Sequence, residues 1–325
     1  MKKISNGIII AVDAGHGSNT AGKRTPNMPV DIDFDGDGIV DVKKGTAIKE
    51  HIANVGVCVF LDKELERCGF KVFKSGWQDE DATDDEDVDL ATRQELIRKA
   101  GCQYSVSVHF NAFGDGKEFN IAEGVGTYYH SNDDRIGDSK LLATIIHKHL
   151  TQGTVQKDRG LNRGSFAMVN CINLNTKASV LVELAFMTNK REAISMMGNA
   201  AFWKESAVEI CKGFCEYLNV RYIGENEEKK EEEKKEEQKG DEKNKGEKFY
   251  TVQVGAFQKL SNAKVLKEKM IKAGYSDAFI KKSTENNIIL YRVQVGAFHV
   301  KSNAVRMLSK LHQTGFDAII KENER

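Results

Sequence analysis

The first two thirds of the chain alternate short apolar runs with longer segments in which apolar residues recur every three or four positions. The short runs predict strands at residues 7–13, 70–73, 104–110, 124–129, 165–169 and 178–184. The longer segments predict helices at residues 46–68, 90–100 and 141–150, with further helices up to residue 217. This alternation indicates an α/β domain with a mostly parallel central sheet flanked by helices.

A polar stretch separates this region from the C-terminal part. Residues 224–248 read GENEEKKEEEKKEEQKGDEKNKGEK and contain no apolar side chain, so they cannot bury a core. As a flexible coil the stretch would span about 25–30 Å, although its Glu and Lys blocks are also compatible with a charged helix. We therefore expect a first domain at 1–223, a linker at 224–248 and a second domain at 249–325.

The second domain contains an internal repeat. YTVQVGAF at residues 250–257 recurs as YRVQVGAF at residues 291–298, and each copy is followed by Ser-Asn-Ala, a helical run and a glycine before an aromatic residue. Ser261 and Ser302 are placed to cap the two helices, and the glycines are placed to end them. Two strand–helix–strand units predict a small βαββαβ domain, ferredoxin-like, with a four-stranded sheet exposed on one face.

Three polar side chains fall at strand and helix ends of the first domain. His16 follows the first strand in DAGHG, Glu50 lies in the first turns of a long helix, and His109 ends the strand in SVSVHFNA. Ligands of open α/β sheets gather at the carboxyl ends of strands, so both histidines should face one crevice, with Asn111 nearby. Two histidines and a glutamate leave one tetrahedral position open for water, as a catalytic zinc ion requires. Structural roles remain the alternative for each residue alone, and His51 competes with Glu50.

The order of these motifs carries a family resemblance. DAGHG, a helix-borne Glu, SVHFNA and LVELAFMTN resemble, across about residues 7–219, the zinc-dependent N-acetylmuramoyl-L-alanine amidases of the amidase_3 type. The resemblance implies that His16, Glu50 and His109 bind zinc and that Glu183 is catalytic. It also implies cleavage of the amide bond between N-acetylmuramic acid and L-alanine by zinc-activated water. Because Glu183 lies in the apolar run VLVELAF, a buried acid with a structural partner is the alternative.

The repeat carries a second resemblance. Residues 249–322, with their doubled VQVGAF, resemble the sporulation-related repeat (SPOR) domain. This implies binding to peptidoglycan glycan strands that have lost their stem peptides, with a generic ferredoxin-like module as the alternative. RNA binding is disfavoured because the aromatic-rich signature of RNA-binding sheets is missing. Together the two parts indicate an autolysin or endolysin; the rivals are a non-catalytic wall-binding regulator and a zinc peptidase acting on another cell-wall amide.

An acidic loop lies between the first two predicted zinc ligands. The run DIDFDGDGIVD matches positions 1, 3, 5, 6 and 9 of a calcium loop with Asp33, Asp35, Asp37, Gly38 and Asp41. Position 12 is Lys44 instead of an acid, so calcium binding and a solvated acidic loop both remain open. A second acidic run, at residues 79–89, is expected to be a solvated loop.

Charge and the N-terminus bear on partners and location. The 325 residues have no net charge, but residues 249–325 carry 13 Lys and Arg against 6 Asp and Glu, a net of +7, which leaves −7 on residues 1–248. The total gives no indication of nucleic-acid or anionic-membrane binding, and no apolar run approaches the roughly 20 residues of a membrane helix.

The basic start at residues 1–3 precedes an apolar stretch of only residues 8–12, and cleavage there would delete DAGHG. We expect synthesis in the cytoplasm without a signal peptide, and action on the wall after release or lysis.

The six cysteines show no CxxC pair and no ladder of short spacings. Most of them lie among apolar residues, where a thiol packs like a small hydrophobic side chain. Reduced core thiols are therefore expected, in preference to disulfides or metal ligands.

Overall fold

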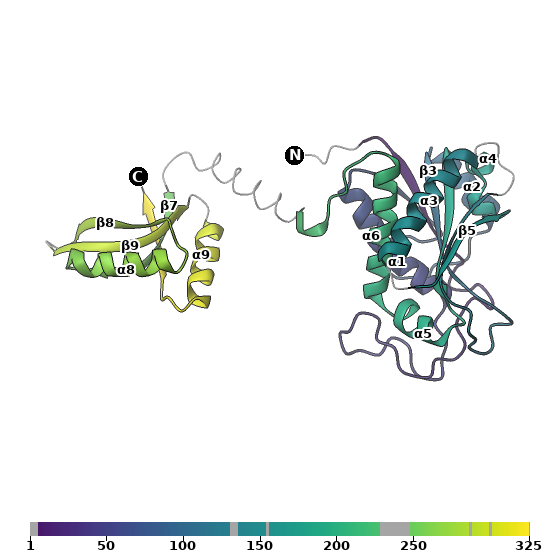
Figure 1. Cartoon of the computed structure of the whole chain (residues 1–325), viewed down its shortest axis with the longest axis horizontal. Helices are drawn as coiled ribbons and strands as arrows, with labels where there is room; N and C mark the ends of the chain where they lie inside the picture. The colour runs from purple at the N-terminus through teal and green to yellow at the C-terminus, as the bar shows by residue number, and fades with distance from the viewer. Residues whose placement is uncertain are drawn as a thin grey trace. The chain divides into compact units, whose positions relative to one another are not determined.

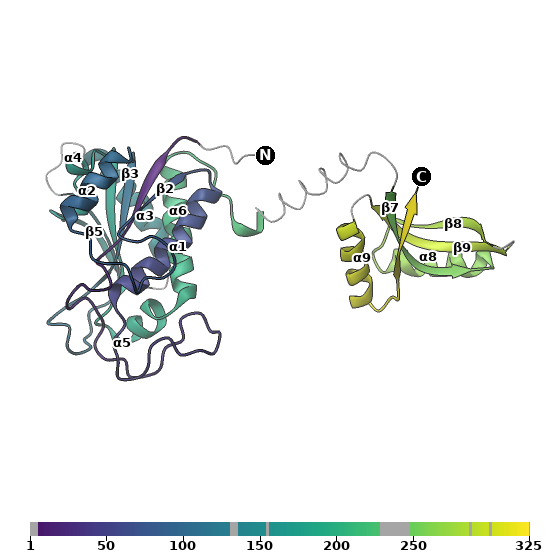
Figure 2. The same cartoon turned by 180° about the vertical axis from the view of Figure 1, so that it is seen from behind.

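The computed structural model describes residues 6–130, 136–153, 156–227, 248–285, 288–298 and 301–324. The chain divides into two compact units, Met1–Glu225 and Asn226–Arg325, and Figures 1 and 2 show each from two sides. The basic start of the chain and most of the predicted linker lie outside the described residues. Within the described ranges, no helix has the length and apolar character needed to cross a bilayer.

The first unit is built on a six-stranded sheet in the order β2-β1-β3-β6-β4-β5. Its strands are β1 (Ile9–Ala14), β2 (Lys71–Ser75), β3 (Tyr104–Asn111), β4 (Val125–His130), β5 (Asp158–Gly164) and β6 (Ala178–Phe186). β2, β1, β3 and β6 run parallel; β4 is antiparallel to β6 and parallel to β5. The predicted α/β fold with a mostly parallel sheet is confirmed.

Helices cover both faces of this sheet (Figure 1). One face packs against α1 (Glu50–Arg67), α3 (Ile136–Gly153) and α6 (Ala200–Tyr217). The other face packs against α2 (Leu90–Lys99), the 3-10 turn η1 (Ala167–Val169) and α4 (Cys171–Leu174). The short α5 (Lys190–Glu192) and the π-turn η2 (Ala193–Met197) lead into α6. The central strands β1, β3 and β6 are buried on both sides, which explains their nearly continuous apolar runs.

One strand prediction about the first unit is wrong. The apolar run at residues 165–169 predicts a strand, but it forms η1, and the edge strand is β5. β5 reads DRGLNRG, and an edge strand need not show the apolar pattern of a central one. The acidic run at 79–89 is a loop whose acids are mostly exposed, as predicted, except that Asp85 is buried against His51; Asp89 caps α2 by accepting from the amide of Thr92.

The second unit has the predicted βαββαβ order. Its elements are β7 (Lys248–Phe257), α8 (Leu260–Lys272), β8 (Ala278–Glu285), β9 (Ile288–Phe298), α9 (Lys301–Gln313) and β10 (Ile319–Glu324). The strands form an antiparallel sheet in the order β10-β7-β9-β8. Val252, Val293 and Val295 pack with Met270 and Leu311 of the helices into a separate core. Ser261 does not cap α8 as predicted, because it lies inside the helix.

A buried ion pair fastens α2 to the end of β1. The Arg93 guanidinium donates to a carboxylate oxygen of Asp13 at 3.0 Å and to the carbonyls of Ala14 and His16. Asp13 also accepts from the hydroxyls of Ser75, at 2.7 Å, and Ser107, at 2.6 Å. Arg93 and Asp13 are 2% and 1% exposed, so each charge depends on the other for compensation.

We predict that Arg93→Met destabilises the first unit by about 3–5 kcal/mol, because it leaves the Asp13 carboxylate buried without its cation. Urea unfolding followed by tryptophan fluorescence measures this, since Trp77 and Trp203, the two tryptophans of the chain, both belong to the first unit. Arg98→Met is the control: Arg98 is on the same helix, but its exposed pair with Glu95 should contribute only about 0–1 kcal/mol. Equal losses in the two variants would contradict the prediction.

Candidate functional site

Glu50 is the first residue of α1 and is buried between two histidines. One of its carboxylate oxygens lies 3.2 Å from Nε2 of His16, and the other lies 3.1 Å from Nδ1 of His109. The amide of Phe110 also donates to Glu50, at 3.1 Å. The carboxylate therefore joins the end of β3 to the loop that follows β1, and the positive end of the α1 dipole favours a charge at this position.

The DAGHG turn brings His16 back over the sheet. His16 has a left-handed backbone, with φ of 66°, and its ring meets that of His109 edge to face at a centroid distance of 5.1 Å. Gly15 allows this approach, because a Cβ atom there would lie 2.2 Å from Cε1 of His109. The turn therefore requires glycine before His16.

The three side chains influence one another's protonation. Burial alone would raise the pKa of Glu50, but the hydrogen bonds and charges of His109 and His16 hold that pKa well below its ordinary value. Burial alone would lower the pKa of His109, but the hydrogen bond and charge of Glu50, with the charges of Glu183 and Asp13, raise it. The carboxylate is thus kept ionised, which is the form that a cation binds.

The donor set fits a zinc ion. Each of His16, Glu50 and His109 offers a ligand atom within 4.8 Å of the other two. Two ligands bound to one zinc ion at tetrahedral angles are about 3.4 Å apart, close to the 3.1–3.2 Å between the nitrogen and oxygen atoms here. His51 does not join this group, because its Nδ1 lies 2.9 Å from the carbonyl of Gly15 and its Nε2 lies 3.1 Å from Asp85.

Glu183 lies beside the histidine–glutamate group on the neighbouring strand. It is the register partner of His109 in the β3–β6 pair. One oxygen, Oε2, is buried and has no hydrogen-bond partner among the described residues. Burial raises the pKa of Glu183 to about 8, with the charge of Glu50 raising it and those of His109 and Lys23 lowering it. The structural partner that would explain a buried acid is not found for this oxygen.

Supporting residues of the site were not identified from the sequence. Ser107 links two parts of it, because its hydroxyl donates to Asp13 and lies 3.1 Å from Nε2 of His109. Arg93 holds the carbonyl of His16. Their only signal in the sequence is a polar residue within an apolar strand or an amphipathic helix, which does not name the partner. Asn111 is the last residue of β3, two positions after His109, and its part in the site stays a prediction.

The acidic loop gathers three of the four predicted calcium ligands. Asp33, Asp35 and Asp37 each offer an oxygen within 4.8 Å of the others. Asp41 instead accepts from the amide of Phe34 at 2.7 Å. The Asp33 carboxylate accepts from the amides of Gly36 and Gly38 at 2.7 and 2.8 Å. These hydrogen bonds hold the loop in a series of turns, and calcium binding stays a prediction.

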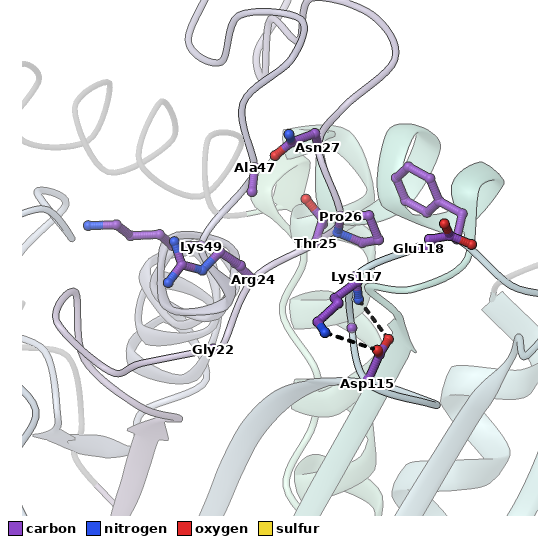
Figure 3. A pocket seen from close by; sticks show the side chains of 12 residues that line it. Gly22, Arg24, Thr25, Pro26, Asn27, Ala47, Lys49, Asp115, Lys117 and Glu118 are labelled. Atoms are coloured by element: carbon purple, nitrogen blue, oxygen red, sulfur yellow. Dashed lines mark hydrogen bonds and ion pairs between the residues drawn. The ribbon is translucent and has the colours of Figure 1, made fainter.

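A cavity of about 680 Å³ has both Lys49 and Lys117 in its lining (Figure 3). Arg24 and Lys49, the residue before Glu50, line one side, and the segment after β3 lines the other with Lys117, which pairs with Asp115 at 3.7 Å. Its lining combines three cationic residues, Arg24, Lys49 and Lys117, with two acids, Asp115 and Glu118, and with apolar surface.

Each of the two units matches a known protein family. The family described as N-acetylmuramoyl-L-alanine amidase (Amidase_3) matches residues 10–216, and the SPOR domain matches residues 246–322. An uncharacterized cell wall amidase of Bacillus anthracis is 30% identical over 134 residues, which cover 39% of this chain and 23% of that protein.

The first unit has the fold of a solved amidase structure and resembles a second one less closely. The N-acetylmuramoyl-L-alanine amidase of Clostridium difficile 630 superimposes with a TM-score of 0.50 at 23% identity, over 66% of this chain and 98% of that one. The catalytic domain of CwlV from Bacillus (Paenibacillus) polymyxa var. colistinus gives a TM-score of 0.48 at 23% identity, over 66% and 99% of the two chains. Because the Amidase_3 match spans more than half of the sequence, this chain belongs to the N-acetylmuramoyl-L-alanine amidase family, and it carries a SPOR domain after the amidase domain.

Proposed function

We propose that the protein is a peptidoglycan hydrolase, an autolysin or endolysin, that cleaves the amide bond between N-acetylmuramic acid and L-alanine. The observation that carries the proposal is the convergence of His16, Glu50 and His109 beside an unpartnered Glu183 in a chain of the amidase family. A non-catalytic wall-binding regulator would have no need to keep this costly arrangement of buried acids.

His16, Glu50 and His109 are the proposed zinc ligands. The bound ion would polarise the substrate carbonyl and lower the pKa of water to roughly 7. The protein's own contribution is to hold the three ligand atoms at fixed distances: the DAGHG turn fixes His16, the α1 N-terminus fixes Glu50, and Ser107 contacts the ring of His109.

Glu183 is the proposed proton-transfer group. A carboxyl with a raised pKa both accepts a proton from water and returns it to the departing amine, because its two protonation states differ little in free energy near neutral pH. Its Oε2 is not engaged by another described group and is available for this exchange.

The cavity beside Lys49 is the proposed site for the stem peptide. It begins at Lys49, next to a proposed zinc ligand, and Arg24 and Lys49 are placed to pair with carboxylates of the peptide. A stem peptide bound in this cavity would have its amide bond to N-acetylmuramic acid at the His16–Glu50–His109 group.

The SPOR unit is proposed to bind glycan strands that lack stem peptides. On the sheet face opposite the apolar core, Arg292 is partly exposed and donates to Gln253 at 2.9 Å, while Thr251, Gln253 and Gln294 are buried. Phe279 is 37% exposed, and Lys281, two positions after it on β8, is the register partner of Arg292. A guanidinium group near an exposed aromatic ring is well suited to a sugar, which presents hydroxyls at its edge and apolar C–H groups on its face.

We predict that His16→Ala and His109→Ala each lose zinc and activity together, because a site with three protein ligands cannot hold the ion firmly with two. Metal content by mass spectrometry and turnover of purified peptidoglycan are the measurements. The control is His149→Ala, which removes a histidine of α3 that pairs with Glu209 and Glu216 of α6. This variant should keep both zinc and activity. Stoichiometric zinc in both ligand variants would show that the ligands are wrongly assigned.

Glu183→Gln should keep zinc and fold but reduce turnover by about a hundred- to ten-thousand-fold, because the amide cannot accept a proton. Activity of the wild type should fall as pH drops through the pKa of Glu183, where the base becomes protonated. Glu123→Gln, at an exposed residue paired with Arg191, is the control. Turnover within about threefold of wild type would remove Glu183 from the mechanism, and loss of zinc would make it a ligand.

Glu183→Gln should also change the stability of the metal-free protein in a pH-dependent way. The pKa of Glu183 is raised from 4.5 to about 8 on folding, so burial of its charge destabilises the folded state increasingly as pH rises from about 4.5 to 8. Metal-free Glu183→Gln should therefore be more stable than metal-free wild type at pH 8, and the difference should vanish near pH 4. Thermal unfolding at the two pH values measures it; a pH-independent difference would contradict the raised pKa.

Truncation after Glu225 should leave an amidase that cuts soluble muropeptide fragments normally but acts more slowly on whole sacculi, because the tether no longer raises its local concentration. Sacculus pelleting measures the binding. Arg292→Ala should weaken binding of the full chain to denuded glycans, whereas Lys264→Ala, which removes one positive charge from the exposed side of α8, should not. Equal losses in the two point variants would indicate nonspecific charge attraction, and unchanged binding after truncation would contradict the role of the SPOR unit.

A further inference from the structure

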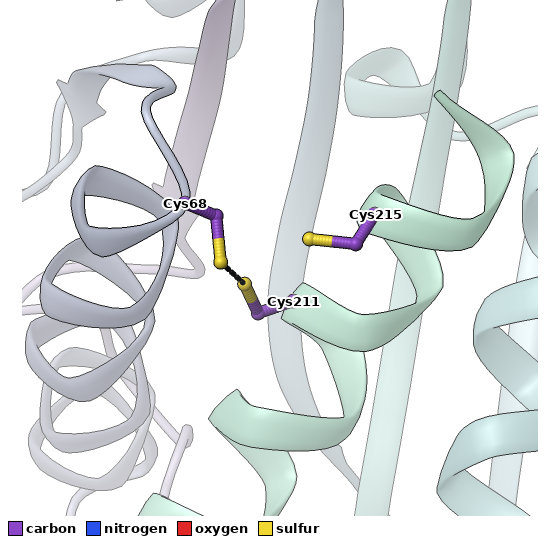
Figure 4. A group of neighbouring side chains, drawn as sticks. All are labelled: Cys68, Cys211 and Cys215. Carbon is purple, nitrogen blue, oxygen red and sulfur yellow. Dashed lines mark hydrogen bonds between the residues drawn. The ribbon is translucent and has the colours of Figure 1, made fainter. Parts of the chain in front are cut away.

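Three buried cysteines converge at the end of α1 that lies away from Glu50. Cys68 follows the last residue of α1, and Cys211 and Cys215 lie four residues apart on one side of α6. The sulfur atoms of Cys68 and Cys211 are 3.9 Å apart, and each of the three sulfurs lies within 4.8 Å of the other two. Figure 4 shows all three side chains directed into the space between the two helices.

This cluster differs from the other cysteines. Cys58, Cys102 and Cys171 are also buried, and in the described part of the chain none of them belongs to a comparable group. Each of those three is accounted for by packing as a small apolar residue. Cys68, at the end of α1, and the two cysteines of α6 bring three thiols together as a set of metal donors. The expectation that all six cysteines are plain core thiols does not explain this cluster.

The spacing of the sulfurs suits a metal ion. Three sulfurs bound at about 2.3 Å around one ion lie about 3.8–4.0 Å apart. The observed distances need only small side-chain movements to reach that arrangement. A disulfide would engage only two of the sulfurs and would require an oxidant, whereas an ion would engage all three.

The surroundings favour a thiophilic ion of low coordination number. Cys68, Cys211 and Cys215 are only 6%, 0% and 2% exposed, which leaves little room for a water ligand. The nearby carboxylate of Glu64 is already engaged, by Arg67 at 2.6 Å and by the hydroxyl of Tyr222 at 2.8 Å. Structural zinc almost always takes four ligands, whereas Cu(I) and similar soft d¹⁰ ions accept three thiolates.

We propose that Cys68, Cys211 and Cys215 form a second metal site, which binds a thiophilic d¹⁰ cation of the Cu(I) type through three sulfur atoms. Each sulfur that binds releases its proton to solvent. The amide of Ile223, which donates to the sulfur of Cys68 at 3.4 Å, stabilises the resulting negative charge.

The location gives this site a structural role. α1 contains 18 residues, so its two ends are about 27 Å apart, and the cysteine cluster is separate from the group around Glu50. The contacts of Tyr222 and Ile223 place the cluster beneath the segment that leads out of the amidase domain. A bound ion would fasten together the end of α1, the end of α6 and this exit segment, and would stabilise the folded domain.

The experiment titrates the reduced full-length protein with Cu(I) under anaerobic conditions. Its readouts are the ultraviolet thiolate-to-metal charge-transfer band, which the His16–Glu50–His109 group cannot produce, and the melting temperature. Wild type should gain the band with one equivalent of ion and melt at a higher temperature. Cys211→Ala should lose the band. Its affinity for Cu(I) should fall by more than roughly 10–100-fold, which is the loss caused by removing a residue that only contacts a metal ligand.

Cys58→Ala is the matched control, since it removes one fully buried sulfur from the same core of the same domain and should behave as wild type. Cys215→Ala replaces Cys211→Ala if the latter does not fold. Absence of the band in wild type, or its full retention in both cluster variants, would overturn the proposal. Mass mapping that finds a Cys68–Cys211 disulfide in the protein, with no ion bound after reduction, would overturn it in favour of a redox pair.

Discussion

Three carboxyl groups near the carboxyl ends of neighbouring strands constrain the rest of the amidase domain: Asp13 and Glu50 are buried, and Glu183 is partly buried. An ionised acid in a protein interior is stable only when a cation or several donors compensate it. Asp13 has Arg93 and two serine hydroxyls, and Glu50 has two histidines and a backbone amide. Glu183 has no such compensation on its Oε2, and its pKa rises accordingly. The three acids of this region thus have three different surroundings, which lower the pKa of Glu50 and raise that of Glu183.

These different surroundings match the proposed division of roles. Asp13, paired with Arg93, fastens the end of β1 to α2. The ionised Glu50 offers a permanent negative charge to a cation, and the proton affinity of Glu183 suits proton transfer near neutral pH. The pair of Asp13 and Arg93 also fixes the turn at His16, because Arg93 donates to both Asp13 and the His16 carbonyl. α2 therefore contributes to the site without presenting a side chain to a substrate.

The sequence was sufficient for features that repeat or that bury apolar residues in series. Central strands are apolar along their whole length, and the doubled VQVGAF defines the second unit, so sheet type and domain order were predictable. β5 was missed because an edge strand does not need that pattern. The partners of the polar residues were missed for a different reason: Asp13 and Arg93 are 80 positions apart, and Cys68 and Cys211 are 143 apart, and no local periodicity relates them.

The same limit applies to the choice between Glu50 and His51. Adjacent helix residues differ by about 100° in direction, so only the three-dimensional surroundings decide which one faces the histidines. In the structure His51 points at Gly15 and Asp85, and in that position it supports the DAGHG turn from below. The helix thus uses two successive residues for two tasks, one toward the proposed metal and one toward the loop that carries His16.

The two proposed activities of the chain reinforce each other. An amidase that releases stem peptides leaves glycan strands without peptides, which is the material that the SPOR unit is proposed to bind. Each cut would create a binding site for the tethered unit, and the tether would keep the amidase near stem peptides that are still attached. Binding of the product by a separate unit does not inhibit the catalytic site, because the glycan is held elsewhere on the chain. Hydrolysis would therefore spread outward from the first point of attack instead of starting at random across the wall.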